Sequence, residues 1–440
     1  MDNTIDFMDQ GSFLGLRARG RDPLIQICWV YDHAVDMAAL RRFHDNLNHG
    51  LLGRRIERSP LPFGRHRWVT WQSPGIDVAP APRPRTEVRD WSNEQAARTI
   101  DPERGPSWRM AVLPLTDGGA AVLLLVSHTI ADGVGGITAA TDAAKGITHD
   151  LGYPPARSRT TFQAMRQDAM VLIRGLPEVF KSILAAARVA KTEGAATATK
   201  KAVAIPAGSD MDRRKLMPSM TVEIDAEQWD ACAKRLGGSA PTLLVGFGVR
   251  YAQVVGWVAA DGLVHVSVPI SERTPDDTRG NALTAVTFEV DPDAVTSDLT
   301  EIRTKFKDSL RTLEESGNAL LGPLPLVSYV PTRVARRLES LVIRDKELGC
   351  SYLGELDPAT NRPDGTDAQS MYMLPFEQHI TYGDLRRVDG VFHPVISGRL
   401  NGKVWISIGY CNGAGSTTKE QLIEAANQVL ADFGLSGVIE

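Results

Sequence analysis

The feature that most constrains this chain is a short apolar run that ends in a polar, glycine-rich segment. Residues 120–126 contain only Ala, Val and Leu. Such a run is typical of a strand that is buried on both faces of a sheet. Residues 127–133 follow with the sequence Ser-His-Thr-Ile-Ala-Asp-Gly, and helix-forming residues resume after Gly136. The pattern predicts a buried strand, a turn and a helix, with His128 at the strand end and Asp132 at the start of the helix.

His128 is the first candidate for a catalytic group. A sheet fixes the backbone at a strand end while the loop exposes the side chain, and a neutral imidazole there can take a proton from an alcohol or an amine without a metal. Asp132 follows too closely to reach His128 easily, so we expect it to pair with a distant cation and hold the loop. Gly133 is expected to allow a tight turn. The alternative is a hydrogen-bonded histidine with no chemical part, and the local pattern does not decide between them.

The length and composition exclude several classes of protein. A chain of 440 residues exceeds the size of most single cores, so we expect two lobes. The net charge of −4 does not favour a nucleic-acid partner. The four cysteines lack Cys-x-x-Cys spacing, which indicates reduced thiols and no zinc site. No apolar run approaches the ~20 residues of a membrane span, and no secretory signal is visible. We therefore expect a cytoplasmic protein, with peripheral membrane contact left open.

Strands and helices are interleaved along the whole chain without Rossmann repeats, which predicts a mixed α/β fold. We expect two sandwich-like lobes that meet at a central cleft, where ligand sites preferentially form. The predicted divisions are an N-terminal lobe that carries the motif, a basic crossover segment with a linker, and a C-terminal lobe; their ranges are 1–153, 154–215 and 216–440.

Local patterns predict particular elements. Residues 24–31 indicate a strand, and Asp36 is a candidate cap for a helix from Met37. Asp117-Gly118 predicts a hairpin that places a neighbouring strand beside the motif strand. Later in the chain, alternating residues predict strands at 220–224 and 404–410.

The crossover segment is markedly basic. Residues 157–201 contain nine Lys and Arg residues but only three acidic ones, on a helical apolar stripe that is interrupted near Pro177. A basic amphipathic segment can bind anionic lipid or the acidic face of a carrier protein. Two crossover helices with solvated charges are the favoured interpretation. Residues 193–201 are typical of a linker.

The motif His128-Thr-Ile-Ala-Asp132-Gly133 resembles the His-x-x-x-Asp-Gly signature of the chloramphenicol acetyltransferase-like acyltransferases. Three further segments are similar to wax ester synthase/diacylglycerol acyltransferases: residues 100–108 before the motif strand, residues 268–273 with the following Gly280-Asn281, and residues 404–413. The resemblance implies a fold of two chloramphenicol acetyltransferase-like lobes in a pseudo-dimeric arrangement around a cleft.

The same resemblance implies an acyl transfer with His128 as the general base. An acceptor hydroxyl or amine would attack a thioester, donated by acyl-CoA or by an acyl carrier protein, with no further cofactor and no metal. Asp132 would pair with Arg273 in a structural role. Asn281 and Ser351 are weaker candidates for lining the cleft. No Gly-x-Ser-x-Gly nucleophile motif or phosphate-binding motif competes with this site.

Two departures from the family pattern matter. Ser127 stands where many relatives carry a further histidine. Residues 349–354 replace the segment typical of lipid-making members and look closer to a strand of condensation domains, which puts a triacylglycerol or wax product in doubt. Ester formation is the leading hypothesis. Amide formation of the condensation type, and a non-catalytic module that docks a carrier protein, remain the alternatives.

Overall fold

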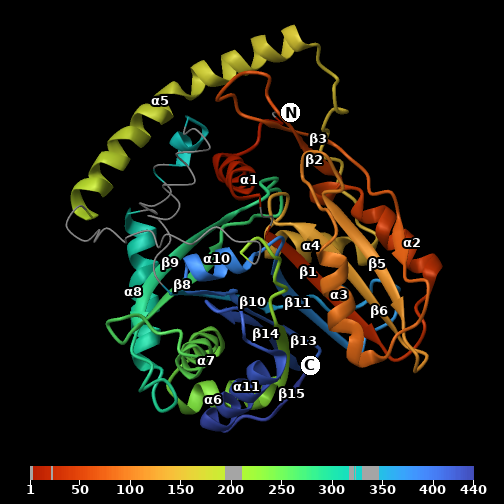
Figure 1. The fold of residues 1–440 in the computed structure, drawn as a ribbon. Helices are drawn as coiled ribbons and strands as arrows, with labels where there is room; N and C mark the ends of the chain where they lie inside the picture. The colour runs from red at the N-terminus through yellow and green to blue at the C-terminus, as the bar shows by residue number, and fades with distance from the viewer. Residues whose placement is uncertain (1–2, 21–22, 194–210, 317–321, 323, 330–345) are drawn as a thin grey trace.

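The computed structural model describes residues 3–20, 23–193, 211–316, 322, 324–329 and 346–440. These residues form two lobes, each built on a β-sheet with helices against it (Figure 1). This arrangement confirms the predicted mixed α/β fold with two lobes.

The first lobe contains a five-stranded sheet in the order β11-β1-β6-β5-β4. Its strands are β1 (Pro23–Tyr31), β4 (Ile76–Val78), β5 (Trp108–Pro114), β6 (Ala120–Ser127) and β11 (Ser370–Glu377). The helices and short elements of this half are α1 (Phe7–Arg19), α2 (Met37–Leu47), α3 (Val88–Ala96), α4 (Gly133–Lys145), η1 (Gly50–Leu52), η2 (Arg85–Glu87), β2 (Arg54–Glu57) and β3 (Arg67–Thr70).

Strand β6 carries the motif, and the structure agrees with the pattern from which it was predicted. All eight of its residues are buried, and it lies between β1 and the hairpin partner β5. Helix α4 packs on one face of the sheet, where Gly136 lies near the side chains of Ile25 and Ile27. A central strand with both neighbours paired holds its end rigidly, so the backbone at His128 is fixed by the sheet.

The second lobe contains eight strands. Seven follow the order β15-β7-β14-β13-β10-β8-β9, and β12 pairs with β14. The strands are β7 (Ser219–Asp225), β8 (Val264–Ser271), β9 (Leu283–Val290), β10 (Glu347–Glu355), β12 (Gly390–Phe392), β13 (Val395–Leu400), β14 (Lys403–Asn412) and β15 (Gly437–Ile439). The helices of this half are α6 (Ala226–Arg235), α7 (Ala240–Val254), α8 (Thr300–Ser316), α10 (Tyr382–Arg387) and α11 (Lys419–Phe433). Two short elements late in the sequence contact helices of the first lobe: η3 (Leu324–Tyr329) contacts α1, and η4 (Pro358–Asn361) contacts α4.

Strand β11 belongs to the first sheet although it lies late in the sequence. It pairs antiparallel with β1, in a register that places Tyr372 opposite Cys28. The chain therefore returns from the second lobe to the first, and the sheets do not follow the predicted boundary at residue 216 completely.

The predicted pair of crossover helices is wrong, because the structure contains one helix there. Helix α5 (Thr161–Glu193) has 33 residues and continues through Pro177 as a gentle arch (Figure 1). Proline removes one backbone hydrogen bond and bends a helix. Pro177 is exposed, so water can solvate the carbonyl that is left without a donor. Residues 194–201 of the predicted linker lie outside the described residues. No helix in the described ranges is long and apolar enough to cross a membrane.

Candidate active site

His128 lies directly after β6 and is half-buried. Its backbone N–H donates to the carbonyl of Pro23 at the start of β1, at 2.9 Å. Its ring nitrogen Nδ1 lies 2.9 Å from Oδ1 of Asn281, a residue from the loop between β8 and β9 of the other lobe. The imidazole is therefore held between the two lobes.

The contacts of Asn281 determine which imidazole nitrogen carries the proton. Its Nδ2 donates to the His128 carbonyl and to Oδ1 of Asp9, both at 3.1 Å. Oδ1 of Asn281 must then be the acceptor toward the ring. This places the hydrogen on Nδ1 and leaves the lone pair of Nε2 available to a proton donor. From the sequence, Asn281 is only a weak candidate for lining the cleft, whereas the structure places it against the imidazole.

Asp9 of α1 completes this side of the site, although it is not among the site residues predicted from the sequence. Its side chain is fully buried, and it accepts hydrogen bonds from the backbone N–H groups of Gly280 at 2.8 Å and Asn281 at 2.7 Å. Burial raises the pKa of the Asp9 carboxyl, and the positive charge of Arg54 and these hydrogen bonds oppose that shift. At Gly280, a Cβ would lie 2.9 Å from the Thr129 carbonyl oxygen, so a residue larger than glycine would not fit.

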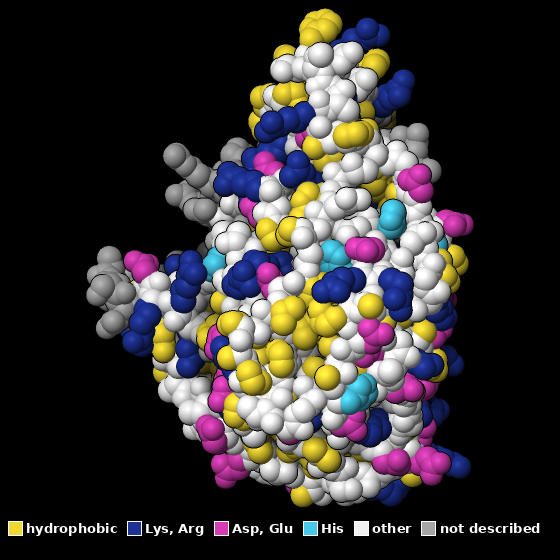
Figure 2. All heavy atoms as spheres, turned by 90° about the vertical axis from the view of Figure 1, so that its right-hand side faces the viewer, with side chains coloured by type: hydrophobic (Ala, Val, Ile, Leu, Met, Phe, Trp, Pro, Cys, Tyr) yellow, Lys and Arg dark blue, Asp and Glu magenta, His cyan; other side chains and the backbone are white. Residues whose placement is uncertain are grey.

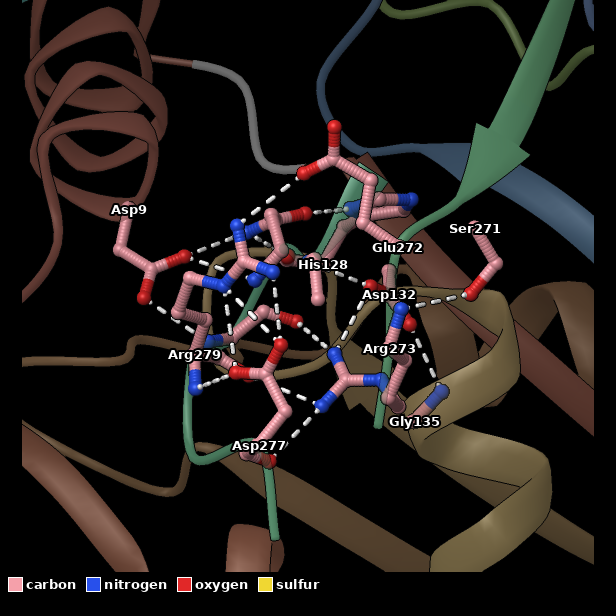
Figure 3. Close-up of polar contacts among 12 residues, drawn as sticks. Asp9, His128, Asp132, Gly135, Ser271, Glu272, Arg273, Asp277 and Arg279 are labelled. Atoms are coloured by element: carbon pink, nitrogen blue, oxygen red, sulfur yellow. Dashed lines mark hydrogen bonds and ion pairs between the residues drawn. The ribbon is translucent and has the colours of Figure 1, made fainter. Parts of the chain in front are cut away.

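Asp132 and Arg273 hold the same loop from the other side (Figure 3). Oδ2 of Asp132 lies 2.8 Å from Nη2 of Arg273, and both side chains are buried. The same oxygen accepts from the N–H of Ala282, while Oδ1 caps α4 by accepting from the N–H of Gly135 at 2.7 Å. The expected pairing of Asp132 with Arg273 is thus present. The carboxylate also joins helix α4 to the loop that carries Asn281.

Gly133 begins α4, and its backbone does not adopt a positive φ, so close packing rather than a left-handed conformation favours glycine there. A Cβ would lie 3.2 Å from the end of the Met373 side chain. Gly135, which is not among the predicted site residues, is under a closer constraint, because a Cβ there would lie 3.1 Å from Nη2 of Arg273.

Arg54 connects two loops of the site through hydrogen bonds to their backbone carbonyl groups. It is fully buried, and its guanidinium carbon lies 3.9 Å from the centre of the Trp68 ring, a cation–π contact. It donates to the carbonyl of Ile130 at 2.8 Å and to the carbonyl of Thr278. One side chain thereby joins the motif turn to the loop that precedes Asn281.

Ser351 does not lie in this group of contacts. It is half-buried in β10, opposite Ile396 of β13. A groove of about 240 Å³ lies between α4 and β10, and Leu353 contributes to it. The groove opens beside the motif helix, with Val134 and Ile137 on the α4 side, but His128 is not among its lining residues.

Asp9 and Arg54 lie far from the motif in sequence, so their spacing gave no signal. The sequence around Asp9 did contain a local signal. It precedes the buried Phe13 by four residues and Leu16 by seven, and thus interrupts the apolar face of a helix with a carboxylate. A buried charge on an apolar face needs a partner, and this marks such a residue as a candidate.

Comparisons with known proteins agree with this architecture. Residues 28–220 match the model of the wax ester synthase/diacylglycerol acyltransferase catalytic domain. None of the curated proteins is similar enough in sequence to count as a match.

Solved structures match over nearly the whole chain. The first condensation domain of the calcium-dependent antibiotic synthetase, in complex with a substrate analogue, has a TM-score of 0.61 at 12% identity, over 100% of this chain and 99% of that chain. Trichothecene 15-O-acetyltransferase from Fusarium sporotrichioides has a TM-score of 0.58 at 13% identity, over 98% and 94%. Wax ester synthase/diacylglycerol acyltransferase from Marinobacter aquaeolei VT8 has a TM-score of 0.56 at 15% identity, over 98% of both chains.

At these identities the structural likeness establishes the fold, and it confirms the resemblance read from the motif. The chain has the two-lobed chloramphenicol acetyltransferase-like fold that acyltransferases and condensation domains share, and its residues 28–220 match the wax ester synthase/diacylglycerol acyltransferase catalytic domain.

Proposed function

We propose that this protein is an acyltransferase that moves an acyl group from a thioester to a hydroxyl acceptor, with His128 as the general base. The observation that carries the proposal is the hydrogen bond between Nδ1 of His128 and Oδ1 of Asn281, because it leaves Nε2 as a proton acceptor. The match of residues 28–220 to an acyltransferase catalytic domain supports the same reaction class.

The reaction follows from the position of one base. Nε2 of His128 takes the proton of the acceptor hydroxyl as its oxygen attacks the thioester carbonyl, and a carbon–oxygen bond forms. The carbon–sulfur bond of the tetrahedral intermediate then breaks, and the imidazolium returns its proton to the departing sulfur. General-base assistance of this kind typically contributes about 10² to 10⁴ in rate. The products are an ester and a free thiol, and the cycle needs no metal or further cofactor.

The roles of the surrounding residues follow from their contacts. Asn281 keeps the imidazole in the tautomer that can accept a proton. Asp132 and Arg273 have a structural part, since they hold the loop of Asn281 against α4. The donor would be acyl-CoA or an acyl carrier protein. An amine acceptor would give an amide by the same proton transfer, and the likeness to a condensation domain makes it the second product to test.

The test is a thiol-release assay on the purified chain, with a panel of acyl-CoAs and with alcohol and amine acceptors in separate arms. His128→Ala should lower kcat/KM by about 10² to 10⁴ while the unfolding free energy is retained. His49→Ala is the matched control, because His49 is exposed and lies outside the site. Full turnover in His128→Ala would refute the base assignment. If the wild-type chain releases thiol with neither acceptor, from acyl-CoA or from an acyl carrier protein, the chain is the non-catalytic docking module.

A further inference from the structure

Helix α5 lies on the outside of the molecule, apart from both sheets (Figure 1). Its 33 residues correspond to a length of about 50 Å. In the part whose side chains are described, residues 161–183, the buried positions are Ala164, Asp168 and Ser182. These lie on one narrow side of the helix, so most of its circumference faces solvent.

The exposed surface of α5 is strongly apolar. Phe162 is 76% exposed, Ile173 64% and Phe180 65%. The full set of large exposed apolar residues on one side of the helix, which we call the apolar stripe, is Phe162, Met165, Ile173, Leu176, Phe180 and Ile183. These positions recur at helical spacing and form a single face that spans about 32 Å. Single exposed apolar residues are ordinary, but a continuous face of this length marks an interaction surface.

Positive charge borders the stripe. Arg166, Arg174 and Lys181 are exposed, and at about 100° per residue all three lie on the same side of the stripe, with Arg166 at its edge and the other two farther around the helix. None of the three forms an ion pair with a carboxylate in the described part of the chain. Where the upper end of α5 projects, hydrophobic and Lys or Arg side chains lie side by side (Figure 2). Arg159 differs, because it is paired with the buried Asp168 at 2.6 Å and anchors the start of the helix.

We infer that α5 is a docking surface for an anionic lipid bilayer, with the apolar stripe inserted at the headgroup level and the basic edge against the lipid phosphates. A helix that lies in a membrane interface buries an apolar face and places cations beside it, which is the arrangement found here. The inference is independent of the chemistry at His128.

Two other occupants fit the surface less well. An acidic carrier protein would place its carboxylates opposite cations, whereas the centre of this face is apolar over its whole length. A second copy of the chain packed through the same stripe would bring two rows of positive charge together, which is repulsive.

The test uses the full chain and sedimentation with large vesicles of phosphatidylcholine alone or of phosphatidylcholine and phosphatidylglycerol at about 3:1. We expect binding to the anionic vesicles that falls steeply as salt is raised. Charge reversal by R166E/R174E/K181E should weaken it roughly 100-fold, on the basis of the usual attraction per basic residue. Phe162→Ser with Ile173→Ser and Phe180→Ser should weaken it at least tenfold.

The matched control replaces three exposed apolar residues elsewhere, Val78, Leu216 and Val438, with serine. This variant should bind vesicles like the wild type. Absence of binding to the anionic vesicles, equal binding to both vesicle types, or equal loss in the control variant would overturn the inference. So would a dimer in the absence of lipid that the stripe substitutions convert to monomer, since the stripe would then be the contact between two copies.

Discussion

The charged side chains at the junction of the two lobes around His128 and those on helix α5 lie in opposite environments. At the junction, Asp9, Asp132 and Arg273 are buried, and backbone or side-chain partners lie within 3.1 Å of each. On α5, Arg166 and Lys181 are exposed beside apolar side chains. Buried charges that are held by close partners favour one geometry, and they are costly to disturb. Exposed charges beside an apolar face cost the fold little and leave the surface available to a partner. The comparison separates residues that hold the site from residues that face something outside the chain.

The largest expected effect is a loss of unfolding free energy at the junction, where the charges are buried. Asp132→Ala should lower the unfolding free energy by about 3–5 kcal/mol, because it leaves the guanidinium of Arg273 buried without its carboxylate. Chemical denaturation of the purified chain measures it. Glu94→Ala is the control, since its ion pair with Arg83 is exposed and should contribute about 0–1 kcal/mol. Equal losses in both variants would show that burial does not distinguish the two pairs.

The next effect is smaller and distinguishes Asp9 from Asp132, because we expect the substitution of Asp9 to act mainly on kcat. Asp9→Asn should lower kcat about 10- to 100-fold with KM unchanged, because an amide cannot accept all three hydrogen bonds that hold Gly280 and Asn281. Steady-state kinetics measure both constants. Asp9 would then be a positioning residue that acts on His128 through Asn281. An unchanged kcat, or a rise in KM alone, would remove that role.

The same variant has an expected dependence on pH. Burial raises the pKa of Asp9 above its usual value near 3.8, so its ionised form is a cost to the folded state. The contribution of Asp9 to the unfolding free energy is fully present below the unfolded-state pKa near 3.8. This contribution is lost as the pH rises through the higher pKa of the folded state. The unfolding free energy of Asp9→Asn, compared with that of the wild type, should therefore improve as the pH rises from about 3.8. A difference that does not change with pH would contradict the shift.

The smallest expected effect is the change in unfolding free energy when the apolar stripe of α5 is altered. Phe162→Ser with Ile173→Ser and Phe180→Ser should change the unfolding free energy by no more than about 0.5 kcal/mol per site, because these side chains face solvent. Leu124→Ala in the buried strand β6 should cost about 2–5 kcal/mol in the same denaturation experiment. A large loss in the α5 variant would mean that the stripe packs within the chain, and the lipid surface would no longer be needed to explain it.

The elements that could be predicted are those whose signal is local. Strand β6 follows from seven consecutive apolar residues, and the cap of α2 by Asp36 follows from residue type and position. The fold and the pairing of Asp132 with Arg273 required the family resemblance, because 141 residues separate the two side chains.

The orientation of His128 could not be predicted. It depends on Asn281, which lies 153 residues after His128, and on Asp9 near the N-terminus. No periodicity or spacing connects three segments that meet only after both lobes have formed. Helix α5 was mispredicted for a different reason, since Pro177 is a strong local break signal that a long, exposed helix tolerates as a bend.

The return of β11 to the first sheet has a consequence for synthesis of the chain. Residues 370–377 are translated last among the strands of that sheet, yet they cover one edge of β1. Until they leave the ribosome, β1 exposes a row of unpaired backbone groups, and such an edge invites pairing with other chains. We therefore expect that the N-terminal lobe does not fold on its own, and that a fragment that stops before residue 370 aggregates even though it contains the whole motif.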